Sequence, residues 1–168
     1  GAMSKEEDFV EHLFIANTHN YMLFFTDKGK CYWLKVYDIP QGGRAARGRA
    51  IVNLIGCEPN EKVEAFVSVK EFDDKHYIVM ATQKGIVKKT VLSAYGKPRK
   101  GGIYAIEIRE GDKLIEARIS NGDHDILLGT SEGKSIRFSE NDIRPSGRKT
   151  MGVKGIKLGS DGDKLVGM

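Results

Sequence analysis

The sequence lacks the features that define several classes of protein. It has only two cysteines, Cys31 and Cys57, and neither has a second cysteine at CxxC spacing. A disulfide framework is therefore not expected, and a reducing cytoplasm is. No window approaches the roughly 18 apolar residues of a membrane-spanning helix, and the four histidines show no metal-ligand spacing. The 40% hydrophobic and 30% charged content is that of a soluble globular chain.

A targeting signal and a helical period are also missing. The first residues, GAMSK, are not followed by the apolar core of a signal peptide, and residues 1–3 are expected to be a scar of expression outside the fold. No segment sustains the period of an amphipathic helix. Twenty glycines against four prolines indicate many tight turns. These observations favour an all-β chain.

What the sequence does contain is a threefold repeat. The tetrapeptides TDKG, TQKG and TSEG end at residues 29, 85 and 133. Each joins two short apolar or β-branched runs, and YMLFFT and KCYWLKV are the first pair. Runs of this kind, joined by a two-residue turn with glycine after it, predict a β-hairpin.

Each hairpin is followed by the same series of segments. A basic, glycine-containing loop comes first: QGGRAARGR, GKPRKGG or RPSGRKTMGVKGIK. A third apolar run follows, and an acidic turn then introduces a fourth. Four short strands in about 50 residues are typical of a propeller blade. The sequence thus predicts one partial domain of three four-stranded blades, over residues 4–70, 71–119 and 120–168.

Three blades are too few to close a typical propeller. We therefore expect either a chain cut from a longer protein or chains that pair to complete a ring. Blades that lack a neighbour leave strand edges unpaired, and such edges favour pairing with another chain. Edge-to-edge self-association is a hypothesis that follows.

Basic residues are concentrated in the three loops. The net charge is +4, and residues 41–49, 96–102 and 144–157 hold three, three and five Lys or Arg residues and no Asp or Glu. Equivalent loops of a propeller lie at equivalent positions, so these loops should line up along one side, with the acidic turns elsewhere. Such a stripe can follow a phosphate backbone, which glycines allow backbone N–H groups to approach. Nothing in the pattern predicts base readout, so sequence-tolerant binding is expected.

No constellation of residues predicts an enzyme. The segment GTSEGKS resembles a phosphate-binding P-loop, but it has three residues instead of four between its glycines and precedes a predicted strand. Neither a nucleophile–base pair nor a carboxylate dyad emerges from the pattern.

Three segments carry a resemblance to a known family. IANTHNYMLFFTDKGKCYWLKVYDIP, RAARGRAIVNL and ATQKGIVKKT resemble the C-terminal domain of the DNA gyrase A subunit, and the resemblance covers residues 6–168. It implies a propeller-like β-pinwheel, six-bladed in the family, in which blades exchange strands. It also implies binding and wrapping of duplex DNA around a basic outer rim, in support of ATP-dependent negative supercoiling by a type II topoisomerase. This chain then looks like an internal portion of about three blades.

The resemblance assigns candidate DNA contacts by position. The family's heptad of the Gln-Arg-Arg-Gly-Gly-Lys-Gly type is not found here, and QGGRAARG is a degenerate relative in the equivalent loop of the next blade. The candidates are Arg44, Arg47 and Arg49 in the first loop, Lys97, Arg99 and Lys100 in the second, and Arg144, Arg148, Lys149 and Lys154 in the third. Weaker candidates, on strands beside these loops, are Lys88, Lys89 and Arg137.

The same resemblance implies a chain without catalytic groups, metal or cofactor of its own. The DNA-cleaving tyrosine, ATP and Mg act in other domains of the holoenzyme. The implied partners are double-stranded DNA, the other gyrase domains and the gyrase B subunit, in the cytoplasm and associated with the nucleoid. Two alternatives stay open: the related C-terminal domain of the topoisomerase IV A subunit, and a protein-interaction propeller with no DNA role.

Overall fold

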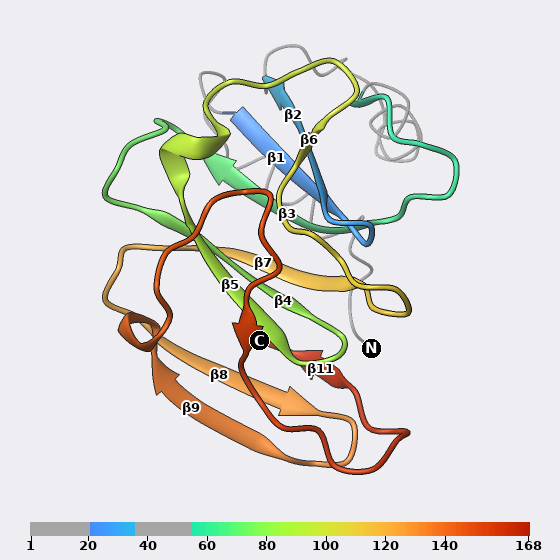
Figure 1. Cartoon of the computed structure of the whole chain (residues 1–168). Coiled ribbons are helices and arrows are strands. Elements are labelled where there is room, and N and C mark those ends of the chain that lie inside the picture. Colours follow the sequence, from blue (N-terminus) through green and yellow to red (C-terminus); the bar gives the residue numbers. More distant parts are fainter. Residues whose placement is uncertain (1–20, 36–54) are drawn as a thin grey trace, which may run out of the picture.

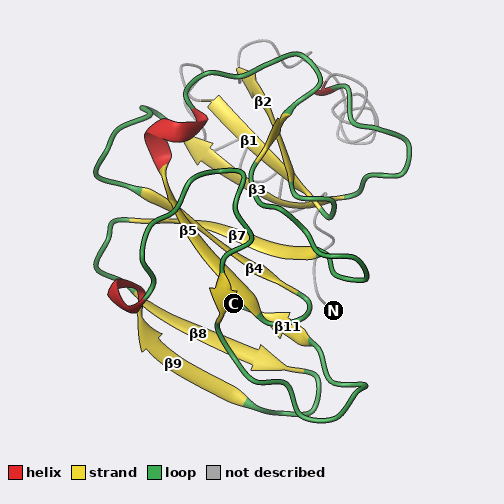
Figure 2. Cartoon of the chain, in the orientation of Figure 1, coloured by secondary structure: helices red, strands yellow, loops and turns green. Residues whose placement is uncertain are grey.

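The strands form three antiparallel sheets that follow one another down the molecule (Figures 1 and 2). The computed structural model describes residues 21–35 and 55–168. The sheet orders are β3-β1-β2-β6, β10-β5-β4-β7 and β11-β8-β9. The strands are β1 (Tyr21–Thr26), β2 (Lys30–Lys35), β3 (Val63–Val69), β4 (Tyr77–Thr82), β5 (Ile86–Val91), β6 (Ile103–Tyr104), β7 (Leu114–Ser120), β8 (Asp125–Thr130), β9 (Ser135–Ser139), β10 (Val153–Lys154) and β11 (Leu165–Gly167). Two short 3-10 helices, η2 (Leu92–Tyr95) and η3 (Glu140–Asp142), follow β5 and β9.

The three TxxG motifs form the hairpin turns β1–β2, β4–β5 and β8–β9. Their glycines have φ values of 84°, 89° and 85°, a left-handed conformation that side chains disfavour. The threonine of each motif is buried, and its Oγ1 accepts a hydrogen bond from the backbone N–H four residues later, at 3.1 to 3.3 Å. Threonine and glycine therefore recur because each fixes one part of the same turn, and the hairpin prediction is confirmed.

Neighbouring sheets exchange a strand. β6 follows β5 in the chain but pairs with β2 of the preceding repeat, and β10 follows β9 but pairs with β5. The crossing is fixed at the hairpin turns, where the carbonyl oxygen of Gly29 accepts from the N–H groups of Ala105 and Ile106 at 2.8 and 3.2 Å, and that of Gly85 accepts from Gly155 at 2.8 Å. The third apolar run of these repeats thus completes the preceding sheet instead of its own.

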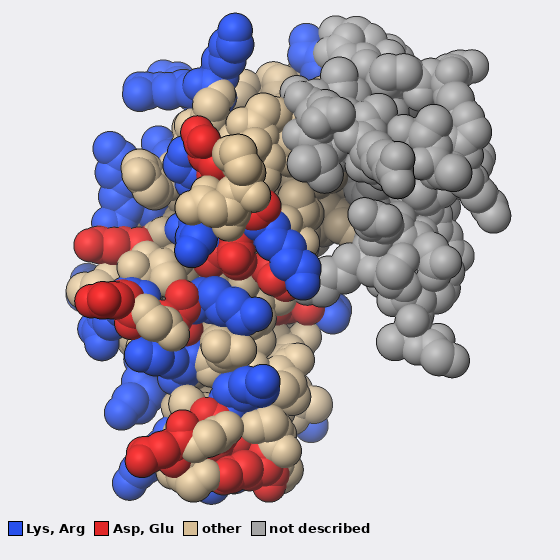
Figure 3. All heavy atoms as spheres, turned by 90° about the vertical axis from the view of Figure 1, so that its right-hand side faces the viewer, with Lys and Arg blue, Asp and Glu red and all other residues tan. Residues whose placement is uncertain are grey.

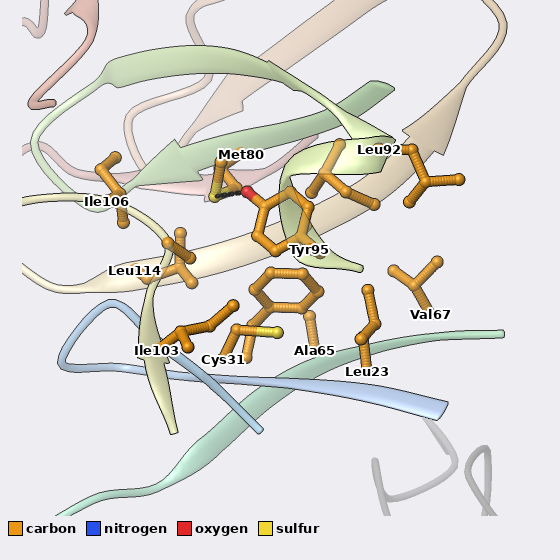
Figure 4. Packing of buried hydrophobic residues seen from close by; sticks show 14 of the residues in the cluster. Leu23, Cys31, Ala65, Val67, Met80, Leu92, Tyr95, Ile103, Ile106 and Leu114 are labelled. Atoms are coloured by element: carbon orange, nitrogen blue, oxygen red, sulfur yellow. Dashed lines mark hydrogen bonds between the residues drawn. The ribbon is translucent and has the colours of Figure 1, made fainter. Parts of the chain in front are cut away.

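The core lies between successive sheets. On β4, Ile78 and Met80 face the first sheet, whereas Val79 and Ala81 face the third. In the cluster between the first two sheets, the Tyr95 hydroxyl points to Met80 Sδ at 3.9 Å and its ring meets Phe25 edge-on (Figure 4). Strands buried on both faces lose the alternation of apolar and polar residues, which explains why YIVMAT is a continuous apolar run.

This architecture confirms the predicted all-β, propeller-like fold with three blade units. The third sheet has three strands, and the outer edge of β9 has no strand partner among residues 21–35 and 55–168. The proposed repeat boundaries stay a prediction.

Candidate nucleic-acid interface

The second basic loop, residues 96–102, leads from η2 to the exchanged strand β6. Lys97, Arg99 and Lys100 are all exposed. The loop is closed by a hydrogen bond from Gly102 N–H to the Arg99 carbonyl oxygen at 3.0 Å, and Gly102 packs closely against the Tyr32 ring. The three side chains therefore extend into solvent from a backbone that is fixed at its C-terminal end.

The third basic loop leads from η3 to the exchanged strand β10 in the same way. Arg144, Lys149 and Lys154 are exposed, and Arg148 is half-buried. The Arg148 guanidinium donates through Nη1 to the carbonyl oxygen of Tyr104 in β6, at 3.0 Å. This contact places the third loop directly beside the strand that the second loop enters.

The first-loop candidates, Arg44, Arg47 and Arg49, lie outside the described residues, so their assignment stays a prediction. The second and third loops are brought together as equivalent elements of successive repeats. Figure 3 shows Lys and Arg side chains along the left margin, which is the side that faces the reader in Figure 1. Acidic side chains interrupt this margin and gather at the bottom of the molecule, so the charges are less cleanly separated than the sequence suggested.

The structure corrects the assignment of Lys88 and Lys89 as outward strand lysines. They are 1% and 3% exposed, so neither ammonium group is available to a phosphate at the surface. Lys88 Nζ donates to two backbone carbonyl oxygens, and Lys89 Nζ lies 3.3 Å from the buried Glu140 carboxylate. Because β5 is central in its sheet, both faces are covered and both side chains are enclosed.

Arg137 is the one weaker strand candidate that reaches solvent. Its side chain is 73% exposed, and its Nη2 and Nε atoms donate to Asp125 Oδ2 at 2.7 and 3.0 Å. The neighbouring carboxylate offsets its charge, which leaves Arg137 a weaker candidate than the loop residues.

Sequence reasoning missed a pair of equivalent grooves at the blade junctions. The first, of about 400 Å³, lies between Lys28, Tyr104 and Lys149 over a floor of Ile106 and Ile108. The second, of about 600 Å³, has Lys84 in the place of Lys28 and a floor of Ile156 and Leu158, with Lys154 and Lys157 on its wall. The recurring lysine of TDKG and TQKG was the signal that could have found them.

Burial controls the pKa of Lys88. Removal from water, followed by repulsion from the Arg148 guanidinium, lowers this pKa from 10.5 to about 7. Burial also raises the pKa of the Cys31 thiol far above its usual range, so this cysteine is an inert core residue.

Within residues 21–35 and 55–168, no three His, Cys, Asp or Glu side chains are grouped so that they could hold a metal ion. No helix in this part of the chain is long and apolar enough to cross a membrane.

Together, the exchanged strands and the repeated basic loops define a propeller-like domain with a polyanion-binding surface. The family model described as "DNA gyrase C-terminal domain, beta-propeller" matches residues 20–70, 76–121 and 124–168. The chain belongs to this family.

Relatives of known identity agree with this assignment. The DNA gyrase A subunit of Clostridium acetobutylicum is 53% identical over 152 residues, which are 90% of this chain and 18% of that protein. The DNA gyrase A subunit of Salmonella typhimurium is 44% identical over 167 residues, which are 99% of this chain and 19% of that protein. The chain thus spans about a fifth of the length of these relatives.

Two solved structures share the fold. The C-terminal domain of DNA topoisomerase IV superposes with a TM-score of 0.81 at 27% identity, over 90% of this chain and 47% of that one. The DNA gyrase A C-terminal domain superposes with a TM-score of 0.73 at 26% identity, over 90% of this chain and 48% of that one. The fold is therefore common to both kinds of topoisomerase, whereas the relatives at 44–53% identity are gyrase A subunits.

Proposed function

We propose that the chain binds duplex DNA through its phosphates, without sequence preference, and bends it as part of the C-terminal domain of the gyrase A subunit. One observation carries the proposal: the acid-free second and third basic loops lie side by side across β6, where Arg148 bonds to Tyr104. Cations spaced along equivalent loops can follow a phosphate backbone over more than one blade. The two lysine-walled grooves lengthen the same basic surface.

In this proposal the chain supplies binding and no catalysis. The reaction, which is ATP-dependent negative supercoiling, belongs to the holoenzyme, in which other domains bind ATP and Mg and the gyrase B subunit is a partner. The relatives' names supply that context. A cytoplasmic, nucleoid-associated location follows from binding chromosomal DNA.

The test is binding of a labelled duplex, measured by fluorescence anisotropy over a series of salt concentrations. Two triple variants remove three charges each: Lys97→Ala with Arg99→Ala and Lys100→Ala, and Arg44→Ala with Arg47→Ala and Arg49→Ala. Each should lower the slope of log affinity against log salt by about two to three, because each lost phosphate contact removes about 0.9.

A matched control separates local contacts from net charge. Lys70, Lys75 and Lys134 are exposed and lie outside the basic loops, and changing all three to alanine removes the same charge. This control should leave the slope within about one unit of wild type. Equal slopes for all variants, or no binding by wild type, would favour the protein-interaction alternative.

A further inference from the structure

Lys88 joins the two elements that carry the described basic loops. Its Nζ donates to the carbonyl oxygens of Ala105 and Arg148, at 2.6 Å each. Ala105 directly follows β6, the strand that the second basic loop enters, and Arg148 lies within the third basic loop. One buried side chain thus links segments from two successive repeats.

The surroundings of Lys88 suit a neutral amine. A neutral amine has two N–H groups, and the two carbonyl oxygens accept both, whereas an ammonium has a third proton to satisfy. Among the described residues, no carboxylate lies within 4.0 Å of this nitrogen, and the charge that acts on it is that of Arg148. Cys31 and Tyr95, on which the Arg148 charge also acts, are kept neutral by burial, which raises the pKa of both.

The blade itself does not require a lysine at this position. The equivalent residue, third after the hairpin glycine, is Tyr32 in the first sheet and Ile136 in the third. Each pairs with an apolar residue at the same place in the ladder, as Lys88 does with Met80. The reason for a lysine in the second sheet must therefore lie in the segments that it contacts.

Arg148 is held at both of its ends. Its backbone carbonyl accepts from Lys88, and its guanidinium donates to the Tyr104 carbonyl oxygen. An arginine fixed in this way loses less side-chain entropy when it meets a phosphate. Lys149, the next residue, lies on the wall of the adjoining groove and is placed by the same backbone contact.

We propose that Lys88 is a positioning residue for the third basic loop, and that it sets where Arg148 and Lys149 meet the DNA backbone. It acts through these residues and does not itself contact DNA. The DNA part of this proposal rests on the proposed function, whereas the positioning part concerns the free protein.

Hydrogen exchange tests the positioning directly. Two backbone amides report on the loop: Ser146 N–H donates to the Lys89 carbonyl oxygen at 2.9 Å, and Glu107 N–H donates to the Thr150 carbonyl oxygen at 3.0 Å. In Lys88→Met, which retains an unbranched side chain of similar length, both should exchange about tenfold faster while the amides of β4 and β8 stay unchanged. Leu114→Ala, a control in the core, should raise exchange without this confinement to the loop. Wild-type protection of both amides in Lys88→Met overturns the proposal.

The amine itself offers a spectroscopic signature. Solvent-exposed lysines titrate near 10.4, so the Lys88 Cε resonance should be the one that titrates about three pH units lower and is absent from Lys88→Met. A midpoint for Lys88 among those of the exposed lysines would show an accessible amine and contradict the enclosed geometry.

A double-mutant cycle tests the link to DNA. Lys88→Met alone should lower duplex affinity by about tenfold at moderate salt, a loss comparable to that of Arg148→Ala with Lys149→Ala. In the background of those two changes, Lys88→Met should cause no further loss, because it acts through them. Additive losses overturn the positioning role. A wild-type protein that does not bind DNA would remove the proposed function, and the exchange experiment would still decide whether Lys88 positions the loop.

Discussion

The second and third sheets are built from the same repeat, but they differ in what covers them. Val79 in β4 and Leu127 in β8 occupy equivalent ladder positions, opposite Lys89 and Arg137. Val79 is 3% exposed because the third sheet packs against it, whereas Leu127 is 60% exposed. The repeat thus specifies a strand with two apolar faces, and the neighbouring blade determines whether both are buried.

The charged residues at the equivalent position differ in the same way. Lys89 lies over the Tyr77 ring, 4.5 Å from its centroid, and pairs with Glu140 in an enclosed site at 3.3 Å. Arg137 pairs with Asp125 at 2.7 Å, in solvent. The shorter pair should contribute less to stability, because water and ions screen it, whereas breaking the enclosed pair leaves a charge buried without its partner.

The largest expected effect is therefore at Lys89. Lys89→Met should lower the free energy of unfolding by about 3 to 5 kcal/mol, and Arg137→Met by less than about 1 kcal/mol. Chemical denaturation of both variants measures the difference. Similar losses in the two variants would show that the covering blade does not control the strength of the pair.

The pH dependence of stability sharpens this comparison. Burial acts to raise the pKa of Glu140, but hydrogen bonds from His124 N–H and the Ser120 hydroxyl, together with Lys89, outweigh it and lower the pKa below 4.5. A carboxyl whose folded-state pKa is lowered contributes stability above its unfolded pKa and loses it as pH falls. In Lys89→Met that loss should begin at a higher pH than in wild type, because part of the lowering is gone.

The hairpin glycines provide a second pair that differs in the space around it. Gly85 and Gly133 have nearly equal φ values, 89° and 85°, but a Cβ on Gly85 would lie 2.9 Å from the Ile156 carbonyl oxygen, and one on Gly133 would meet nothing within 4 Å. Gly133→Ala should cost about 1 to 2 kcal/mol for the left-handed backbone, and Gly85→Ala about 1 to 3 kcal/mol more for the clash. Equal losses in denaturant melts would mean that the exchanged strand yields without cost.

Features that depend on local chemistry could be predicted from the sequence. Threonine and glycine at fixed spacing specify the hairpin turns, and short apolar runs between turns specify strands. The basic loops were found because their composition is local too. The destination of the third apolar run was not apparent from its residues, because it depends on hydrogen bonds to Gly29 and Gly85 of the preceding repeat.

The orientation of strand lysines could not be predicted for the same reason. IVKKTV resembles a strand with exposed lysines, since neighbouring residues point to opposite faces and one face is commonly wet. Here η3 brings Glu140 to one face, and the Ala105 and Arg148 carbonyl oxygens lie at the other. These partners are 17 to 60 residues away in the chain. In the third sheet, where Arg137 takes the equivalent position, the reading of an exposed strand cation is correct.

Edge-to-edge self-association stays a prediction, and the third sheet is where it would be tested. The outer edge of β9 has no strand partner within the described residues. Light scattering at high concentration should show a dimer if this edge pairs. A strict monomer would remove the hypothesis.

The smallest expected effect compares Val79 with Leu127 directly. Val79→Ala should lower the free energy of unfolding by about 2 kcal/mol, because it removes buried methyl groups and leaves a cavity between the second and third sheets. Leu127→Ala removes more carbon but should change stability by less than about 0.5 kcal/mol, because that side chain is already in water. Denaturation at low protein concentration keeps self-association out of the measurement. If Leu127→Ala proves as costly as Val79→Ala at that concentration and more costly at a higher one, the exposed face is covered in solution by a second copy of the chain.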